Sequence, residues 1–125
     1  DRIAGIVYME AVFPIPSWES WPEKARSIFQ GFRSSKGTDM ILKRNLFVER
    51  VLPGSVLRKL TPDEMEVYRR PFLRPGEDRR PTLTWPREIP IAGKPAAMVE
   101  ICESYTRWLE QCTSLPKLFI NATPG

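Results

Sequence analysis

The 125-residue sequence contains no histidine, so the commonest general base and a common metal ligand are absent from it. Its cysteines and carboxylates do not gather at the spacing of metal ligands, and we expect neither a metal nor a cofactor. No apolar run approaches the ~20 residues that a membrane-spanning helix needs, so no membrane partner is expected.

Cysteine is scarce as well, with only Cys102 and Cys112. If both lie on one helix, their separation along its axis is ~15 Å. A disulfide requires Cα atoms within ~7 Å of each other. We therefore expect two free thiols and a reducing compartment, which makes the cytoplasm the predicted location.

The chain also lacks a concentrated block of one charge, although its formal net charge is +4. Basic residues are scattered, and acidic neighbours such as Glu49, Glu66 and Glu77 separate them. This pattern is typical of a solvated surface and gives no reason to expect a nucleic-acid partner.

Two apolar runs have the composition of buried parallel strands, residues 3–9 (IAGIVYM) and residues 117–121 (KLFIN). Between them, residues 95–112 are expected to form a helix, because apolar residues recur at helical spacing along it: Met98, Ile101, Cys102, Tyr105, Leu109 and Cys112. A strand, a helix and a parallel strand form one βαβ unit and predict an α/β fold.

The two strands are too far apart in sequence for a simple βαβ unit, so we expect an insertion after the first strand. Ligands bind at the carboxyl ends of strands in open α/β sheets, which places the insertion where a lid would lie. The predicted organisation is a core segment at residues 1–12, a helical cap domain at 13–93 and a second core segment at 94–125.

Short helices interrupted by proline are predicted within the insertion. Ser20 and Glu23 have the spacing of a capping box, and so do Thr61 and Glu64. Further helical pieces are expected at residues 40–43 and 46–52, the second ending before Pro53. Residues 82–90, which follow Arg79-Arg80-Pro81, are expected to be partly extended.

Glu10 directly follows the first apolar strand, where a buried carboxylate without a partner is costly. It is either an edge or helix-capping acid, or a catalytic acid at the carboxyl rim of the sheet. In hydrolases of this fold class, a nucleophile, an acid and a histidine arrive in that order from different strand ends. Position alone does not choose between these roles.

The sequence resembles haloalkane dehalogenases of the subfamily in which the catalytic acid follows the sixth strand. The resemblance covers essentially the whole chain and rests on segments in the family's order and spacing: YMEAVFPIPSWESWP at 8–22, NLFVE at 45–49, RKLT at 58–61, YRRPF at 68–72, WPREIPIAG at 85–93 and PKLFINATPG at 116–125. It implies a partial α/β-hydrolase fold, with two parallel core strands, a helix and a helical cap (lid) insertion.

The resemblance also implies a chemistry. An aspartate displaces halide from the substrate carbon as an alkyl-enzyme ester, and a histidine activates water to hydrolyse it. Glu10 matches the acid that supports this histidine, whereas the nucleophile, the histidine and the halide-holding residues match no segment of this chain. The implied partners are a small apolar haloalkane, water, the halide ion and the remaining segments of the same core.

By position, Phe47 and Pro86 match residues beside the halide site of the family. Six others match the pocket wall and tunnel mouth: Trp21, Ala25, Phe29, Leu52, Ser55 and Ile89. Each could instead simply pack in the lid core. Lys24 departs from the bulky apolar residue often found at its place, which leaves the shape of the tunnel open.

Two alternatives accompany this interpretation, a luciferase as the second hypothesis and a non-catalytic fragment as the third. Residues 79–86 (RRPTLTWP) are similar to the animal branch of the family, which includes the Renilla-type luciferase, so a coelenterazine monooxygenase is possible on the same fold. The third reading is a non-catalytic fragment or binding module. The chain starts at Asp1 followed almost at once by a strand, which suggests a longer protein, and two strands with a lid do not close a sheet.

Overall fold

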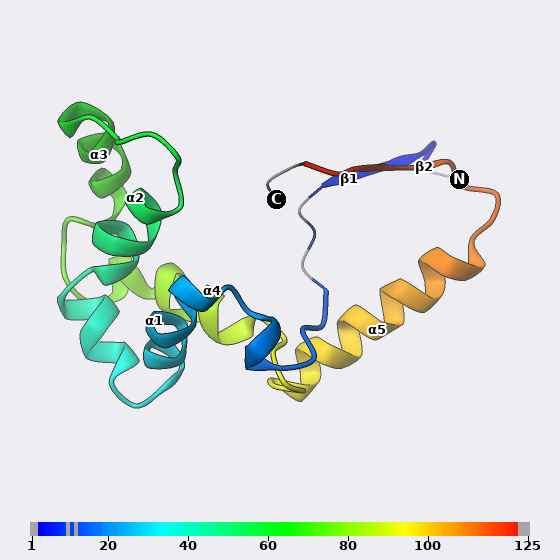
Figure 1. Cartoon of the computed structure of the whole chain (residues 1–125), viewed down its shortest axis with the longest axis horizontal. Coiled ribbons are helices and arrows are strands. Elements are labelled where there is room, and N and C mark those ends of the chain that lie inside the picture. Colours follow the sequence, from blue (N-terminus) through cyan, green and yellow to red (C-terminus); the bar gives the residue numbers. More distant parts are fainter. Residues whose placement is uncertain (1–2, 10, 12, 123–125) are drawn as a thin grey trace. The chain divides into compact units, whose positions relative to one another are not determined.

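The computed structural model describes residues 3–9, 11 and 13–122, and its elements follow the chain as drawn in Figure 1. The chain divides into two compact units. Unit 1 comprises residues 1–16 and 89–125, and unit 2 comprises residues 17–88. No helix in the described ranges is both long enough and apolar enough to cross a bilayer.

Unit 1 contains strands β1 (Ile6–Met9) and β2 (Lys117–Ile120) and helix α5 (Ala96–Gln111). The strands pair in parallel, with Ile6 opposite Lys117 and Met9 opposite Ile120. Both strands and the helix were predicted, and the observed strands are shorter than their apolar runs. The two cysteines are free, as the spacing required.

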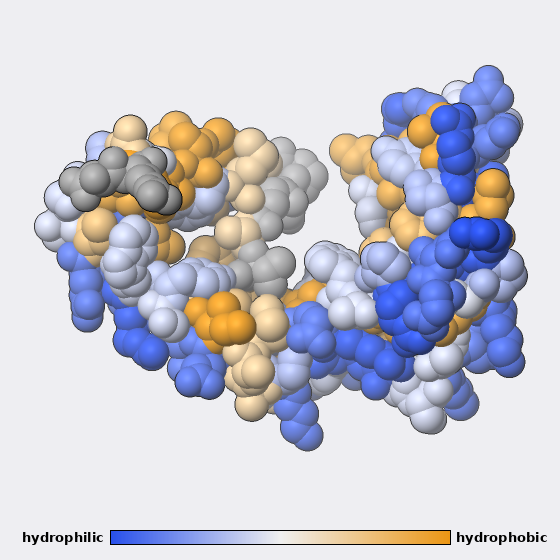
Figure 2. Space-filling model, turned by 180° about the vertical axis from the view of Figure 1, so that it is seen from behind, coloured by the Kyte–Doolittle hydropathy of each residue, from blue (hydrophilic) through white to orange (hydrophobic). Residues whose placement is uncertain are grey.

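The strands carry apolar side chains on both faces, as expected for a parallel sheet, yet much of this surface is exposed within the described part of the chain. The most exposed of these side chains are Val7, Met9, Leu118 and Phe119. Figure 2 shows hydrophobic residues gathered over the strands. Two strands alone therefore do not bury the apolar surface that their sequence provides.

Unit 2 is made of short helical segments. Its α-helices are α1 (Glu23–Arg33), α2 (Leu52–Gly54), α3 (Pro62–Arg69) and α4 (Arg80–Glu88). The segments η1 (Trp18–Ser20), η4 (Arg70–Phe72) and η5 (Glu77–Arg79) are 3₁₀ helices, whereas η2 (Asp39–Lys43) and η3 (Phe47–Val51) are π-helices.

The core of unit 2 lies where α1, η2 and α4 meet. Phe32, Ile41, Leu42 and Leu83 form a buried cluster there, and partly buried apolar residues surround it. Because short helices are marginal by themselves, this burial rather than intrinsic propensity holds them in place.

The capping box predicted at Ser20 is wrong. Ser20 ends the 3₁₀ helix η1, and α1 begins after Pro22 without a side-chain bond to its first turn. Trp21 precedes a proline and is extended, with ψ of 143°, so the helix does not reach back to Ser20. The capping box at Thr61 is confirmed, with both reciprocal bonds to Glu64 in place.

The extended conformation predicted for residues 82–90 is also wrong, because α4 occupies most of them. Pro81 lies in the first turn, where its missing N–H costs no hydrogen bond. Pro86 removes one bond in the last turn, while Leu83 and Pro86 are buried. Burial therefore outweighs the proline penalty. The helix predicted to end before Pro53 likewise continues through Gly54.

The Thr61 capping box generates a prediction about acid stability. Two hydrogen bonds from Arg58, together with the backbone N–H of Thr61, lower the pKa of Glu64 from its usual 4.5 to about 2. A carboxyl group with a depressed folded-state pKa stabilises the fold above about pH 4.5, and this contribution is lost as the pH falls toward 2. Glu64→Gln should therefore flatten the fall in melting temperature between pH 4.5 and pH 2.

The measurement is a thermal melt at several pH values on the full-length protein that carries this chain. Glu66→Gln replaces an exposed carboxylate on the same helix and serves as the control. Equal slopes for Glu64→Gln and the unaltered protein would contradict the prediction.

Candidate pocket wall in unit 2

Four aromatic side chains in unit 2 form a continuous row, which we call the aromatic wall: Trp21, Phe29, Trp85 and Phe47. The ring centroids of Trp21 and Phe29 lie 4.9 Å apart, and those of Phe29 and Trp85 lie 6.2 Å apart. Trp85 then meets Phe47 edge to face at 5.7 Å. These are favourable aromatic geometries, and together they make a stiff apolar surface.

Three separate elements supply this wall. Phe29 is on α1, Trp85 on α4 and Phe47 on η3, while Trp21 lies just before α1. Phe47 stands two residues after Asn45, whose φ of 53° is in the left-handed region that asparagine tolerates. That turn separates the two π-helices, and a backbone irregularity of this kind is frequent at functional sites.

The predicted pocket residues fall into three classes of exposure. Phe29, Pro86 and Ile89 are buried, and Pro86 is among the fully buried side chains. Trp21, Ala25, Phe47 and Leu52 are half-buried. Ser55 is exposed, and its hydroxyl donates to the carbonyl of Val51 at 2.8 Å. Their contact with a substrate stays a prediction.

Not all of these residues belong to one unit. The structure brings Trp21, Phe29 and Phe47 together through Trp85, within unit 2. Ile89 belongs to unit 1. Glu10, the predicted catalytic acid, lies outside the described residues. It follows Met9, the last residue of β1, which pairs with Ile120 at the end of β2.

Trp85 is the member of the wall that sequence reasoning missed. It was overlooked because residues 82–90 were expected to be partly extended, whereas α4 turns Trp85 between Phe29 and Phe47. About half of its surface is exposed, so it is the most accessible ring of the wall. The available signal was its position directly before Pro86.

One buried cation ties the wall's supporting segments together. Arg79 is 8% exposed, and its guanidinium donates to four backbone carbonyls. Its Nη1 reaches Leu42 at 3.1 Å and Lys43 at 2.7 Å, its Nε reaches Phe72 at 2.8 Å, and its Nη2 reaches Leu73 at 3.1 Å. The end of η2, the end of η4 and the end of η5, directly before α4, are thereby joined at one side chain.

A second cation fixes α3 to η3. Arg69 donates to both carboxylate oxygens of Glu49, from Nε at 2.8 Å and from Nη2 at 2.7 Å. These bonds lower the pKa of Glu49 and raise the pKa of Arg69. The two-point geometry is the strongest form of this pair and holds the helix that carries Phe47.

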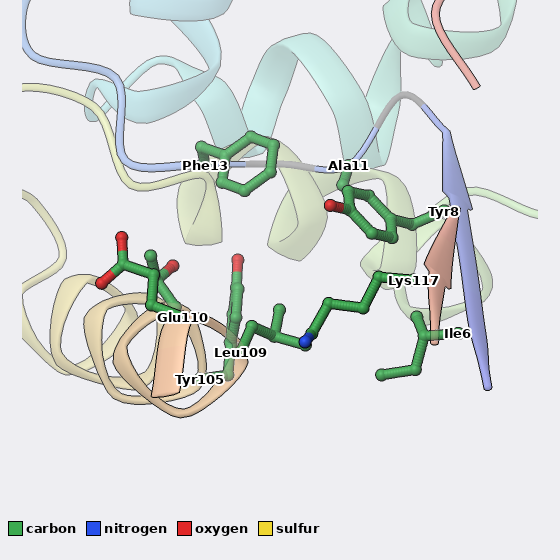
Figure 3. A pocket seen from close by; sticks show the side chains of 9 residues that line it. Ile6, Tyr8, Ala11, Phe13, Tyr105, Leu109, Glu110 and Lys117 are labelled. Atoms are coloured by element: carbon green, nitrogen blue, oxygen red, sulfur yellow. The ribbon is translucent and has the colours of Figure 1, made fainter. Parts of the chain in front are cut away.

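Unit 1 contains a cavity of about 410 Å³ between α5 and the strands. Figure 3 shows Tyr8 and Lys117 reaching from the strands and Tyr105 and Leu109 reaching from the helix. The pKa of Tyr105 is raised to about 12. The largest cause is a hydrogen bond with the Cys102 thiol, and the next is burial of the Tyr105 side chain. Tyr105 therefore stays protonated near neutral pH and is not a base there.

Chemically, the aromatic wall suits an apolar ligand, because it presents ring faces and edges with few polar groups. Within the described part of the chain, no group of three or more His, Cys, Asp or Glu could hold a metal. The aromatic wall is thus a continuous apolar surface made of ring faces and edges.

Comparison with known proteins finds relatives that match the whole chain. It is 54% identical over all 125 residues to a haloalkane dehalogenase of Sphingobium indicum and 50% identical to one of Mycolicibacterium smegmatis. It is 44% identical to the coelenterazine h 2-monooxygenase of Renilla reniformis. The chain spans 40–42% of the length of these relatives. No family model matches it.

Solved structures agree with these relatives. The chain superposes on the haloalkane dehalogenase of Bradyrhizobium elkani with a TM-score of 0.87 and 43% identity, covering 98% of this chain and 42% of the other. It superposes on that of Agrobacterium tumefaciens with a TM-score of 0.89 and 26% identity, covering 100% and 43%. The predicted α/β-hydrolase fold is confirmed as a partial fold.

The Arg79 network generates a prediction about stability. Arg79→Met keeps the length of the side chain but removes its donors from four carbonyls, of which that of Leu42 still accepts from the N–H of Gly76 at 3.0 Å. Each buried polar group left unpaired costs about 1–3 kcal/mol, and partial rehydration of exposed carbonyls offsets part of the total. We expect the free energy of unfolding to fall by about 3 kcal/mol in a denaturant titration.

Arg74→Met is the matched control, because Arg74 is exposed and pairs with Asp78 on the surface. Such a pair contributes about 0–1 kcal/mol. If both variants lost the same small stability, Arg79 would not be the junction described above.

Proposed function

Because the chain is homologous over its whole length to haloalkane dehalogenases and has their α/β-hydrolase fold, we propose that it forms one segment of an enzyme that hydrolyses haloalkanes to an alcohol and a halide ion. The observation that carries this proposal is the 54% identity over all 125 residues. The aromatic wall supports it, since such substrates are small and apolar.

In the proposed reaction, an aspartate oxygen attacks the carbon that carries the halogen. A carbon–oxygen ester bond forms, and the halide leaves with the electron pair of the broken bond. Water, deprotonated by a histidine, then attacks the ester carbonyl and releases the alcohol and the aspartate. The sequence has no histidine, so we assign that base to another segment of the same core.

Glu10 is the proposed triad acid. It follows the carboxyl end of β1 in the sequence, at the sheet edge where ligands bind in this fold class. Its role would be to hold the histidine in the correct tautomer and to stabilise its protonated form. The alternative position for an acid, after β2, reads Asn121-Ala122-Thr123-Pro124-Gly125 and offers no carboxylate.

Residues 13–93 are the proposed lid over the substrate. Phe47, Pro86, Trp21 and Phe29 would line or support the apolar pocket, and Ala25, Leu52, Ser55 and Ile89 would complete its wall and mouth. A dry pocket strengthens the few polar contacts made to the leaving halide. The proposed partners are the haloalkane, water, the halide ion and the remaining core segments. The two free cysteines favour a cytoplasmic location.

A second candidate is a coelenterazine-oxidising luciferase. The observation that favours it is the 44% identity to the Renilla reniformis enzyme over the whole chain. The dehalogenase relatives are more similar at 50–54%, and the stretch Phe13-Pro14-Ile15-Pro16 has the dehalogenase form. We therefore rank hydrolysis first.

The first functional prediction concerns the full-length protein that carries this chain. It should release bromide from primary bromoalkanes of short and medium chain length without any added cofactor, as followed by a halide assay. Light on addition of coelenterazine should not exceed that of a dehalogenase control. Absence of halide release across the series would contradict the proposal, and strong luminescence would reverse the ranking.

The second functional prediction concerns Glu10→Gln. The amide no longer stabilises a protonated histidine, and an equivalent change in a hydrolase triad lowers turnover by about 10⁴-fold. Steady-state halide release should fall on the order of 10³–10⁴-fold, while a rapid-mix experiment still shows a burst of one halide per enzyme.

Glu100→Gln replaces an exposed carboxylate of α5 and serves as the control, with full turnover expected. Unchanged turnover in a folded Glu10→Gln protein would remove Glu10 from the triad.

A further inference from the structure

We propose that Arg33 and Arg87 are positioning residues which, by clasping α1 to α4, fix the contact of Phe29 with Trp85, and thereby set the shape of the aromatic wall and the preference for substrate chain length. The inference rests on the proposed function and adds two residues to it. We call these two side chains and their carbonyl partners the arginine clasp.

The first half of the clasp corrects a defect at the end of α4. The carbonyl of Pro86 would normally accept from the N–H of residue 90, but residue 90 is a proline and has no N–H. Arg33 supplies the missing donor, with Nη1 2.9 Å from the carbonyl oxygen of Pro86. Arg33 therefore holds directly a residue of the proposed pocket.

The second half corrects a similar defect at the end of α1. The carbonyl of Phe32 would accept from the N–H of Lys36, but that N–H instead donates to the hydroxyl of Ser34 at 3.2 Å. Arg87 of α4 donates from Nε to Phe32 at 3.0 Å and from Nη2 to the carbonyl of Ser34 at 3.2 Å.

A glycine keeps this second half open. A Cβ atom added to Gly37 would lie 2.0 Å from the carbonyl oxygen of Phe32 and 3.0 Å from Nη2 of Arg87. Only glycine lets the chain pass so close to the carbonyl that Arg87 binds. The sequence therefore contains a third residue whose identity the clasp requires.

The bonds are reciprocal, since each helix gives an arginine from its last turn and receives one at its own carboxyl end. Cations at these ends also interact favourably with the helix dipole. Arg33 additionally lies over the Trp18 ring, 5.7 Å from its centroid, which limits its freedom. The clasp thus fixes α1 relative to α4 by donors of defined direction.

The aromatic contact across the two helices lies beside the clasp. Phe29 is one turn before Arg33, and Trp85 is two residues before Arg87. Their rings meet edge to face, at 6.2 Å and 70°. A shift of either helix therefore changes this contact, and with it the width of the surface that an alkyl chain would meet.

The experiment uses the full-length protein with Arg33→Met, Arg87→Met, their double variant and the conservative Arg87→Lys. KM and kcat are measured for a homologous series of 1-bromoalkanes. A misplacement of ~1 Å can cost up to ~10²-fold in reactivity, so we expect the relative kcat/KM of long against short substrates to change about tenfold. The change should come mainly from KM, and Arg87→Lys should restore part of it.

Arg80→Met is the matched control, because Arg80 lies on α4 like Arg87 but forms only a surface ion pair, with Glu77 of η5. It should leave the chain-length profile unaltered. A purely structural clasp would lower the melting temperature and the active fraction equally for all substrates. An unchanged chain-length profile in the folded Met and Lys variants would overturn the proposal. The change in relative kcat/KM should be smaller in the double variant than the product of the changes in the two single variants, because both arginines hold the same pair of helices.

A readout without catalysis separates this proposal from the proposed function. The near-ultraviolet circular dichroism of the aromatic wall should change in Arg87→Met and in Gly37→Ala, and stay unchanged in Arg80→Met. If the unaltered protein released no halide, the proposed function would fail, and this spectrum would still test the clasp. Spectra identical to that of the unaltered protein would refute the clasp itself.

Discussion

The architecture of unit 2 depends on how its backbone carbonyls at helix ends are satisfied. Short helices have a high proportion of terminal groups without an intrahelical partner, and such groups are costly when buried. In this unit, arginine side chains supply the missing donors at three junctions. Arg79 serves η2 and η4, Arg87 serves α1, and Arg33 serves α4.

This solution explains why a proline-rich segment still forms a defined surface. Proline at positions 86 and 90 removes donors from the end of α4, yet the helix remains in place because a donor arrives from α1. The rings of the aromatic wall are then held by the same elements that the arginines join. Unit 2 can therefore consist of short helices and still present a defined surface, because the arginine–carbonyl bonds between the helices hold them in place.

Much of the fold was accessible from the sequence. The two apolar runs predicted the parallel strands, the apolar stripe predicted α5, and Thr61 with Glu64 predicted the start of α3. These features depend on local patterns. The helix at 80–88 was missed because two prolines argue against it locally. Only the burial of Pro86 and the packing of Leu83 against residues of α1 and η2 reverse that argument.

In the candidate site, too, local patterns were informative and long-range contacts were not predicted. Matching the family's segments assigned Trp21 and Phe29 to the pocket wall and Phe47 to the side of the halide site, which stay predictions. That their rings are joined through Trp85 required the true conformation of α4. Likewise, the sequence alone does not indicate that Arg33 and Arg87 serve carbonyls more than fifty residues away. Long-range donors of this kind leave no periodic signal.

The excess of positive charge acquires a different meaning from these contacts. Nineteen basic residues against fifteen acidic ones would ordinarily suggest a protein drawn to polyanions. Here, three arginines donate to peptide oxygens at helix ends, with Arg79 buried and Arg33 and Arg87 partly buried. The alkaline balance of the sequence is therefore partly a record of how its helices end, and a surface potential deduced from composition alone would be overstated.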